Sequence, residues 1–469
     1  MPAKKLPLHV DRSARVSLSE QIRIGITEAI FNGVLTPGSR LPSWIDLAAQ
    51  LGVSRGTVKA AYERLADEQL VISSRAQGTC VAQFLPARSP ALTHPDPVPG
   101  SSLYQDFFFP TGDFQMGIPA SDAFPSTLFS RVFSASARNF MNLPQRYSDP
   151  RGEPELKREI AAQLVLSRGI RCHPSQIFIT AGFTGALGVI LHALGLRGQR
   201  AWVENPGFPP ARRALEIAGL SLVPVPVDHE GIQVSYGMEY AQQAALALVT
   251  PGQQAPLGIT LSLERREQLL AWAANNQSWI IEDDYLGELQ LARRAAPALA
   301  SMDNAGRVIY IGSFSKTISP FLRLGFMVVP AVLVEDVADV VASLAPAPDP
   351  ALQMAVRTFL REGHFLRHLR KMKRTYSARS AIMVDVLKQL GYDADVHGLS
   401  VLLHLKEGVN DRAIARHTSR HGFAPSPLSA WYDAGHPARE GLLLGLATGG
   451  EARIRQACEE LDHLIRQLY

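Results

Sequence analysis

The side chains best suited to chemistry gather around Lys316, in the stretch SFSKTISPFLR at residues 313–323. This stretch directly follows an apolar run at 307–312, RVIYIG, which predicts a buried strand. A second such run, SWIIED at 278–283, ends in Asp283. Because ligands of open α/β sheets bind outside the carboxyl ends of strands, both ends should face one crevice. The polar side chains expected there are Lys316, Asp283, Tyr285, Arg323, Ser313 and Ser315.

An amine, a carboxylate, a phenol, hydroxyls and a guanidinium are the groups that pyridoxal 5′-phosphate needs from a protein. Its aldehyde forms a Schiff base with a lysine amine, and its ring nitrogen takes a carboxylate partner. Its phenolic oxygen accepts a hydrogen bond from a tyrosine, and its phosphate binds arginine, hydroxyls and the amides at a helix start. The residues expected to supply these groups, in the order just given, are Lys316, Asp283, Tyr285, Arg323, Ser313 and Ser315. A single lysine in a loop is usually only solvated, so the companions of Lys316 are what favours cofactor chemistry.

Two further stretches complete the expected site. The turn ITAGFTGAL at 179–187 lies between a predicted strand and a predicted helix. There Gly182, Phe183 and Thr184 would offer backbone amides and a hydroxyl to the phosphate. Phe208, in ENPGFPP, is the aromatic residue expected to cover the ring face, with ordinary core packing as the alternative.

The chain of 469 residues is too long for one ordinary core, which indicates at least two domains. A net charge of +4, from 47 basic and 43 acidic residues, is compatible with DNA binding. The three cysteines, Cys80, Cys172 and Cys458, lack disulfide or metal spacing. The start, MPAKKLPLHVDRS, contains no apolar signal segment, and the longest apolar stretch is interrupted by a proline and two acids. We therefore expect a cytoplasmic protein.

The first part of the chain has the pattern of a DNA-binding module. Apolar residues at helical spacing predict a helix over 17–33, and two shorter helices follow at 44–51 and 55–69, the second capped by Ser54. The short connection LGVS between them makes a helix-turn-helix. Two β-prone runs at 70–84, on either side of a polar turn with a glycine, predict a wing.

The second short helix is the expected recognition helix, which inserts into the major groove with its first residues on base edges. Arg55 is placed to bind guanine, Thr57 to contact a base or phosphate, and Lys59 faces away from the apolar stripe. Arg40 and Arg75, in the preceding turn and in the wing, would reach phosphates or the minor groove. The expected DNA-binding set is Arg40, Ser54, Arg55, Thr57, Lys59, Arg75 and Gly78. The alternative is a set of solvated charges on a small helical bundle.

After this module, which spans residues 10–82, the sequence pattern changes twice. A proline-rich stretch without periodicity at 83–106 predicts a linker. In 107–469, apolar runs alternate with helical stretches, which indicates an α/β domain with a parallel or mixed sheet covered on both faces. The expected strands are 176–180, 200–204, 220–227, 245–250, 278–283 and 307–312. A smaller domain is expected after about residue 340.

The module resembles the winged-helix domain of the GntR family through TPGSRLPS (36–43), LAAQLGVSRGTVKAAYERL (47–65) and GTCVA (78–82). The region after it resembles a fold-type I, class I/II aminotransferase. The stretches that carry this second likeness are YSDPRGEPELKREIA (147–161), VENPGFPPARRALEIAG (203–219), IIEDDYLGEL (280–289) and GSFSKTISPFLRLGFMVVP (312–330). The whole chain is similar to the MocR subfamily of GntR regulators, which includes GabR-like and PdxR-like proteins.

The resemblance implies roles and an assembly. Lys316 would be the lysine that holds pyridoxal phosphate, Asp283 the partner of its ring nitrogen and Tyr285 the donor to its phenolic oxygen. Proteins of this kind form head-to-tail homodimers in which each site borrows groups from the partner subunit, and Tyr147 is expected to be one of them.

Three departures from the family pattern bear on the ligand. Phe208 stands where a tyrosine is frequent, and TPGQQAPLG at 250–258 replaces the Asn-Pro-Thr-Gly-like turn of aminotransferases. In GLLLGLA (441–447), Leu443 stands where many aminotransferases carry the arginine that grips a substrate carboxylate. Without it, such a carboxylate would need another cation, for example Arg439.

These observations favour a transcriptional regulator that binds operator DNA and senses pyridoxal phosphate or its adduct with an amine. Two alternatives stay open: a working aminotransferase with a DNA-binding appendage, and a DNA-binding dimer for which the aminotransferase-like fold is only a scaffold. Because Leu443 cannot bind a carboxylate, we expect the signal that the regulator senses to be pyridoxal phosphate itself or an amine that lacks an α-carboxylate.

Overall fold

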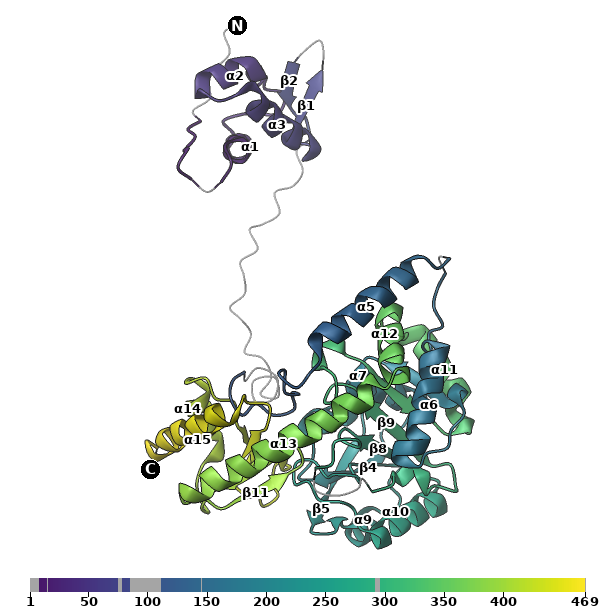
Figure 1. Cartoon of the computed structure of the whole chain (residues 1–469). Coiled ribbons are helices and arrows are strands. Elements are labelled where there is room, and N and C mark those ends of the chain that lie inside the picture. Colours follow the sequence, from purple (N-terminus) through teal and green to yellow (C-terminus); the bar gives the residue numbers. More distant parts are fainter. Residues whose placement is uncertain are drawn as a thin grey trace. The chain divides into compact units, whose positions relative to one another are not determined.

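The computed structural model describes residues 8–14, 16–74, 78–84, 111–144, 146–291 and 296–468. The chain divides into two units, residues 1–99 and 100–469 (Figure 1). Of the linker expected at 83–106, only residues 83 and 84 belong to the described part. Within the described ranges, none of the helices has the length and apolar composition that crossing a membrane requires.

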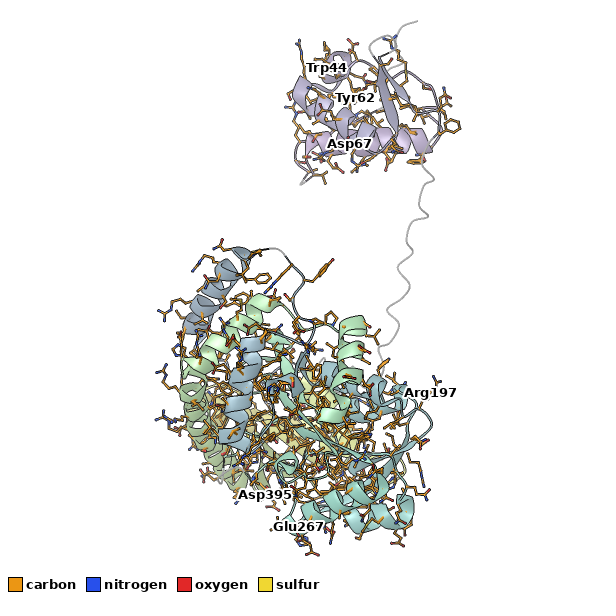
Figure 2. The ribbon with its side chains drawn as sticks, turned by 90° about the vertical axis from the view of Figure 1, so that its right-hand side faces the viewer. Trp44, Tyr62, Asp67, Arg197, Glu267 and Asp395 are labelled. Carbon is orange, nitrogen blue, oxygen red and sulfur yellow. The ribbon has the colours of Figure 1, made fainter. Side chains whose placement is uncertain are left out.

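The first unit is a winged helix-turn-helix, as the sequence predicts. Its elements are α1 (Leu18–Phe31), α2 (Trp44–Leu51), α3 (Arg55–Asp67), β1 (Val71–Ser74) and β2 (Gly78–Val81). Helices α1 and α3 share a core because Ile22 and Ile26 meet Val58 and Leu65, all fully buried. The wing strands β1 and β2 pair antiparallel. Figure 2 shows Tyr62 within this unit, and its hydroxyl donates to the carbonyl of Pro42 at 2.9 Å, which fastens the turn before α2 onto α3.

The second unit is built on an eight-stranded sheet with strand order β3-β10-β9-β8-β7-β4-β5-β6. Its strands are β3 (Ile177–Thr180), β4 (Arg200–Asn205), β5 (Ser221–Asp228), β6 (Gly231–Ile232), β7 (Leu246–Val249), β8 (Trp279–Asp284), β9 (Val308–Ser313) and β10 (Gly325–Val328). Strands β5, β4, β7, β8 and β9 are parallel, whereas β10 runs antiparallel to both β9 and β3. The predicted α/β sheet is confirmed. Strand β10 was not among the expected strands, because it lies within a longer apolar stretch, residues 324–344, in which nothing marks the two ends of the strand.

Helices cover both faces of this sheet, which explains why its strands are apolar almost throughout. In β9, Ile309 and Ile311 lie in one apolar cluster and Val308 in another, because successive side chains of a strand point to opposite faces. The first cluster includes residues of α7 (Gly182–Leu194), α8 (Pro209–Ile217) and α11 (Val334–Leu344). The second includes residues of α9 (Val234–Ala241) and α10 (Leu263–Asn276), which Figure 1 shows below the sheet.

A smaller antiparallel sheet with strand order β11-β12-β14-β13 follows. Its strands are β11 (Ala394–His397), β12 (Ser400–His404), β13 (Ser426–Pro427) and β14 (Gly441–Gly445). The helices of this part are α13 (His364–Gln389), α14 (Asp411–Ser419) and α15 (Glu451–Arg466). Within the described residues of the second unit, the other α-helices are α5 (Ser126–Met141), α6 (Pro154–Arg168) and α12 (Pro350–Arg361).

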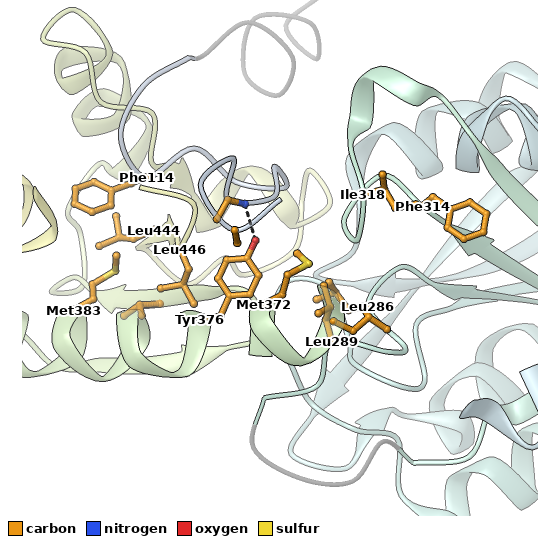
Figure 3. Packing of buried hydrophobic residues seen from close by; sticks show 14 of the residues in the cluster. Phe114, Leu286, Leu289, Phe314, Ile318, Met372, Tyr376, Met383, Leu444 and Leu446 are labelled. Atoms are coloured by element: carbon orange, nitrogen blue, oxygen red, sulfur yellow. Dashed lines mark hydrogen bonds between the residues drawn. The ribbon is translucent and has the colours of Figure 1, made fainter. Parts of the chain in front are cut away.

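The long helix α13 anchors the segment that precedes α5. Its buried side chains Met372 and Tyr376 pack with Leu446 of the region after β14 (Figure 3). The amide of Ala120 donates a hydrogen bond of 2.7 Å to the hydroxyl of Tyr376, drawn as a dashed line in Figure 3. This bond holds in place the chain just after residues 115–118, which form part of a cavity wall.

Candidate functional site

Loops at the carboxyl edge of the large sheet enclose a cavity of about 380 Å³. All ten residues that the sequence assigned to a cofactor line this cavity. They are Lys316, Asp283, Tyr285, Arg323, Ser313, Ser315, Gly182, Phe183, Thr184 and Phe208. The structure therefore brings together side chains that are up to 141 positions apart in the sequence (Gly182 and Arg323).

The strand order explains this meeting. Strands β8 and β9 are parallel neighbours, so the residues after each strand emerge at the same edge of the sheet. Because β10 is antiparallel to β9, the loop that carries Lys316 and Arg323 turns back over this same edge. Strand β3, on the other side of β10, delivers the start of α7 there as well.

Lys316 lies within the cavity with its amine close to the backbone. Its Nζ donates to the carbonyl oxygen of Gly117 at 2.5 Å. Burial lowers the pKa of Lys316 to about 8, although the nearby carboxyl of Asp283 acts in the opposite direction. Gly117 has φ +75°, and a Cβ atom there would lie 2.6 Å from Nζ of Lys316. The sequence analysis missed Gly117, because QMGIPA contains no pattern that relates it to a distant lysine.

Asp283 and Tyr285 lie at the end of β8. The side chain of Asp283 is buried, and among the described residues no side chain or amide donates a hydrogen bond to its carboxyl group. Burial raises its pKa well above the usual value, and the neighbouring Asp284 and Glu204 act in the same direction. Burial also raises the pKa of Tyr285, so its hydroxyl keeps its proton and stays a donor. A protonated ring nitrogen in the cavity would satisfy Asp283, and a phenolate oxygen would satisfy Tyr285.

The start of α7 and the loop before β10 form an anion-binding corner. No side chain caps the first turn of α7, which leaves backbone amides of Gly182, Phe183 and Thr184 available to a ligand. Arg323 donates through Nη2 to Oγ1 of Thr184 at 3.3 Å, which holds its guanidinium beside this turn. Earlier in the same loop, the amide of Ser315 donates to Ser313 Oγ at 3.1 Å. A cation, hydroxyls and helix-start amides in this arrangement suit a phosphate group.

Phe208 lines the cavity and also packs against other aromatic rings. Its ring lies 6.3 Å from that of Phe183 in an edge-on contact and 5.8 Å from that of Trp431 in a tilted one. Phe208 can therefore pack against the core and still cover one face of a cofactor ring. Trp431 is a lining residue that the sequence analysis missed, since it comes from the distant region before β14.

Two buried acids at the carboxyl edge of the sheet, Asp284 of β8 and Glu204 of β4, have partners of their own. Nε of Arg168 lies 2.6 Å from Oδ2 of Asp284, and the hydroxyl of Tyr310 donates to the same oxygen at 2.6 Å. Glu204 accepts hydrogen bonds from the amide and the hydroxyl of Thr250, at 3.0 Å and 2.5 Å. The sequence analysis missed these groups because a buried ion pair has no spacing signature when its partners lie on α6 and β8.

Two residues singled out in the sequence do not line the cavity. The side chain of Tyr147 is fully exposed in the single chain (102%). Arg439 is also exposed and lies outside the lining residues. Leu443, at the position where an arginine was considered, is a fully buried residue of β14.

In the first unit, the exposed start of α3 presents the expected base-contacting residues. Arg55 is the first residue of α3 and is exposed. No described residue forms an ion pair with Arg55, so its guanidinium is available. Lys59 is exposed but lies 3.7 Å from Glu63, one turn further along. Trp44, at the start of α2, is 41% exposed (Figure 2).

The wing brings Arg40 and Gly78 together. Arg40 forms an isolated backbone bridge with Cys80 of β2. Gly78 has φ +75°, and a Cβ atom there would lie 3.3 Å from Nε of Arg40, so glycine leaves room for the guanidinium. Arg75 lies outside the described residues.

Ser54 and Thr57 stabilise the recognition helix itself. The Oγ atom of Ser54 accepts from the amide of Thr57 at 3.1 Å, as an N-cap does, and lies 2.8 Å from the Thr57 hydroxyl. These hydrogen bonds give both residues a structural role beside the expected contact with DNA.

We predict that Ser54→Ala destabilises α3 locally by about 1 kcal/mol, the usual cost of losing an N-cap. Hydrogen exchange of the full chain, followed by mass spectrometry, should show amides at 55–67 exchanging roughly fivefold faster. Ser54→Asp keeps an acceptor at the cap and should retain the protection. Equal exchange in Ser54→Ala and the unchanged chain would show that the cap does not stabilise α3.

Comparisons with known proteins agree with this architecture. Residues 18–81 match the family described as bacterial regulatory proteins of the gntR family, and residues 125–404 match aminotransferase class I and II. The second unit is similar in fold to an archaeal alanine:glyoxylate aminotransferase, with a TM-score of 0.71 and 24% identity over 78% of this chain and 94% of that one. The fold and the site thus define a helix-turn-helix regulator joined to a domain with the aminotransferase fold.

Relatives with the same two parts match almost the whole chain. The probable rhizopine catabolism regulatory protein MocR of Rhizobium meliloti is 33% identical over 97% of this chain and 95% of its own. The HTH-type pyridoxine biosynthesis transcriptional regulator PdxR of Corynebacterium glutamicum is 29% identical over 98% of both chains. The chain belongs to the MocR subfamily of GntR transcriptional regulators.

Proposed function

We propose that this regulator binds pyridoxal 5′-phosphate, or its adduct with an amine, in the cavity and changes its binding to operator DNA in response. The observation that carries the proposal is the single cavity where Lys316, Asp283, Tyr285 and Arg323 converge, on a chain that also has a winged helix. As a DNA-binding regulator it would act in the cytoplasm.

The residues present fit the cofactor group by group. The cofactor supplies an aldehyde, to whose carbon the amine of Lys316 would bond with release of one water. Asp283 would share a proton with the ring nitrogen. Its buried carboxyl group, which accepts no hydrogen bond from the described residues, would thereby gain a partner. Tyr285 would donate to the phenolic oxygen, and Arg323 with the start of α7 would bind the phosphate.

Regulation requires two states of the protein with unequal affinity for the ligand. A ligand shifts an equilibrium only by its difference in affinity for the two states. The cavity is walled by parts far apart in the sequence, from residues 115–118 to Trp431, so a ligand that fills it would favour one arrangement of these parts. The affinity for operator DNA would change as well if the two winged helices of a dimer are spaced differently in the two states.

The test is a DNA-binding titration of the full chain with and without pyridoxal phosphate. Duplexes are first selected from random sequence with the purified chain, and their affinity is then measured by fluorescence anisotropy. We expect the affinity for selected duplexes to change at least fivefold upon cofactor addition. An unchanged affinity, in a protein whose absorption spectrum shows bound cofactor, would refute cofactor-dependent regulation.

The pKa of Lys316 predicts how cofactor capture depends on pH. Only the neutral amine attacks an aldehyde, and burial lowers the pKa of Lys316 from 10.5 to about 8. The rate of capture by the cofactor-free chain should therefore rise with pH and level off above about pH 8. Stopped-flow absorbance measures this rate. A rate that keeps rising toward pH 10 would indicate a lysine with an ordinary, solvated amine.

The proposal includes a homodimer in which Tyr147 of each chain completes the partner's cavity. The full exposure of Tyr147 in the single chain supports this role. Tyr147→Ala should weaken cofactor binding at both sites of the dimer. In mixed dimers with Lys316→Ala chains, one site regains both residues, so half of the binding capacity should return. Mixed dimers with no recovered capacity would contradict the exchange of Tyr147.

A working aminotransferase is the alternative, and the buried Leu443 at the expected place of the carboxylate-binding arginine counts against it. Sustained turnover of an amino acid with an oxo acid, at a rate typical of enzymes, would favour that alternative.

A further inference from the structure

The part of the cavity wall that the expected cofactor residues do not form is neutral. It comes from residues 115–118, from the turn between β11 and β12, and from the region around β13. Its polar side chains are Gln115, His397, Ser400 and Ser426. Among the described lining residues, Lys316 and Arg323 are the only lysine or arginine, and both belong to the cofactor set.

Leu443, at the position where an arginine was considered, packs behind this wall with the lining residues Ala255 and Trp431. It is fully buried in β14, opposite Leu402 of β12 and Ser426 of β13. Its apolar neighbours include Ala255, Leu402 and Trp431. A ligand carboxylate placed against this wall would lose its hydration without gaining a cation, which is strongly unfavourable.

His397 is the one titratable side chain in this part of the wall, as far as the described lining residues show. Its Nδ1 is hydrogen-bonded to the carbonyl oxygen of Leu257, so Nδ1 carries the proton and Nε2 is the acceptor. Burial lowers the pKa of His397; Asp395 opposes this effect, whereas His404 and Arg439 add to it. Nε2 is buried and has no hydrogen-bond partner among the described residues. In this neutral form, with its Nδ1 proton already donated to Leu257, His397 offers no cation to a ligand carboxylate.

We infer that the effector is a primary amine without a carboxylate, whose remaining groups are apolar or uncharged polar ones, as the wall is. This inference rests on the cofactor binding proposed above. The effector amine would take the place of Lys316 at the aldehyde carbon. One carbon–nitrogen bond forms to the effector as the bond to Lys316 breaks, and the effector's two amine protons pass to the lysine. No oxidant or reductant is needed.

The test compares amines that differ only in the carboxylate. The full chain, loaded with pyridoxal phosphate, is titrated with isoamylamine against leucine and with ethanolamine against serine, and the change in the visible absorption spectrum is recorded. We expect half-saturation at a concentration at least tenfold lower for each amine than for its amino acid. Equal or better binding of the amino acids, or no spectral change with any of the four, would overturn the inference. A protein that gives no cofactor spectrum at all would instead refute the proposed function.

Three variants sharpen this comparison. Leu443→Arg should lower the half-saturating concentration of leucine at least tenfold relative to isoamylamine. Because an arginine in a fully buried strand can prevent folding, Gln115→Arg provides a second test at a partly exposed lining position: it should lower the half-saturating concentration of leucine at least fivefold relative to isoamylamine. Arg439→Ala should leave all four titrations unchanged. A loss of amino-acid binding in Arg439→Ala would show that Arg439 grips a carboxylate and would overturn the inference.

Discussion

Replacing Lys316 with alanine should abolish covalent capture of pyridoxal phosphate. The amine of Lys316 is the only lysine amine among the described residues that line the cavity. It also has the chemical state that capture needs, because burial lowers its pKa to about 8. After borohydride reduction, mass spectrometry should find the pyridoxyl group on the unchanged chain at residue 316 and only background labelling in Lys316→Ala.

The matched control is Lys371→Ala. Lys371 is exposed, its Nζ lies 3.3 Å from the carbonyl oxygen of Asp122, and it does not line the cavity. This variant should be labelled like the unchanged chain. Undiminished labelling of Lys316→Ala would falsify the assignment of Lys316, and labelling lost in both variants would point to a folding defect rather than to lost chemistry.

Replacing Arg55 with alanine should weaken binding to selected DNA by about 1–3 kcal/mol, roughly 5- to 150-fold, the range for one bidentate contact with guanine. Arg55 is exposed at the first position of α3, where a recognition helix contacts base edges. Because this contact would read a base, the loss should fall on selected sequences and leave binding to random DNA nearly unchanged. Fluorescence anisotropy with both kinds of duplex measures the difference.

Arg64→Ala is the control on the same helix. Nη1 of Arg64 lies 2.9 Å from Oε2 of Glu20 in α1, so this arginine already has a partner within the unit. Its removal should change affinity for selected and random duplexes by less than about twofold, as surface pairs contribute little. An equal loss on both kinds of duplex for Arg55→Ala would make Arg55 a phosphate contact, and its effect should then depend more strongly on salt.

The sequence alone predicted much of the local structure. Helical spacing predicted α1, α2 and α3, and a serine cap also predicted the start of α3, since these signals act within a few residues. Continuous apolar runs predicted β3, β4, β5, β7, β8 and β9 within one or two residues, because a strand buried on both faces needs apolar side chains at every position. The order of chemistry-bearing residues after these runs also predicted which side chains meet in the cavity.

The sequence was silent on groups whose position depends on the packing of distant elements. Gly117 matters because the segment before α5 lies against Lys316, a contact across 199 positions. Strand β10 is apolar throughout a longer stretch, so only its pairing with β9 and β3 identifies it.

Tertiary structure also determined the charge and polarity of the cavity wall that the expected cofactor residues do not form. The residue type of Leu443 showed that an arginine was missing, but only packing shows that apolar neighbours enclose that position and that no cation replaces it among the described lining residues. Likewise, only the fold shows that Nδ1 of His397 is hydrogen-bonded to the carbonyl oxygen of Leu257, 140 positions away. Local patterns therefore determined the elements and the reactive set, because both depend on neighbours in the chain. The environment of each reactive group depends on burial and on charges brought by distant segments, and it is this environment that sets pKa values and ligand preference.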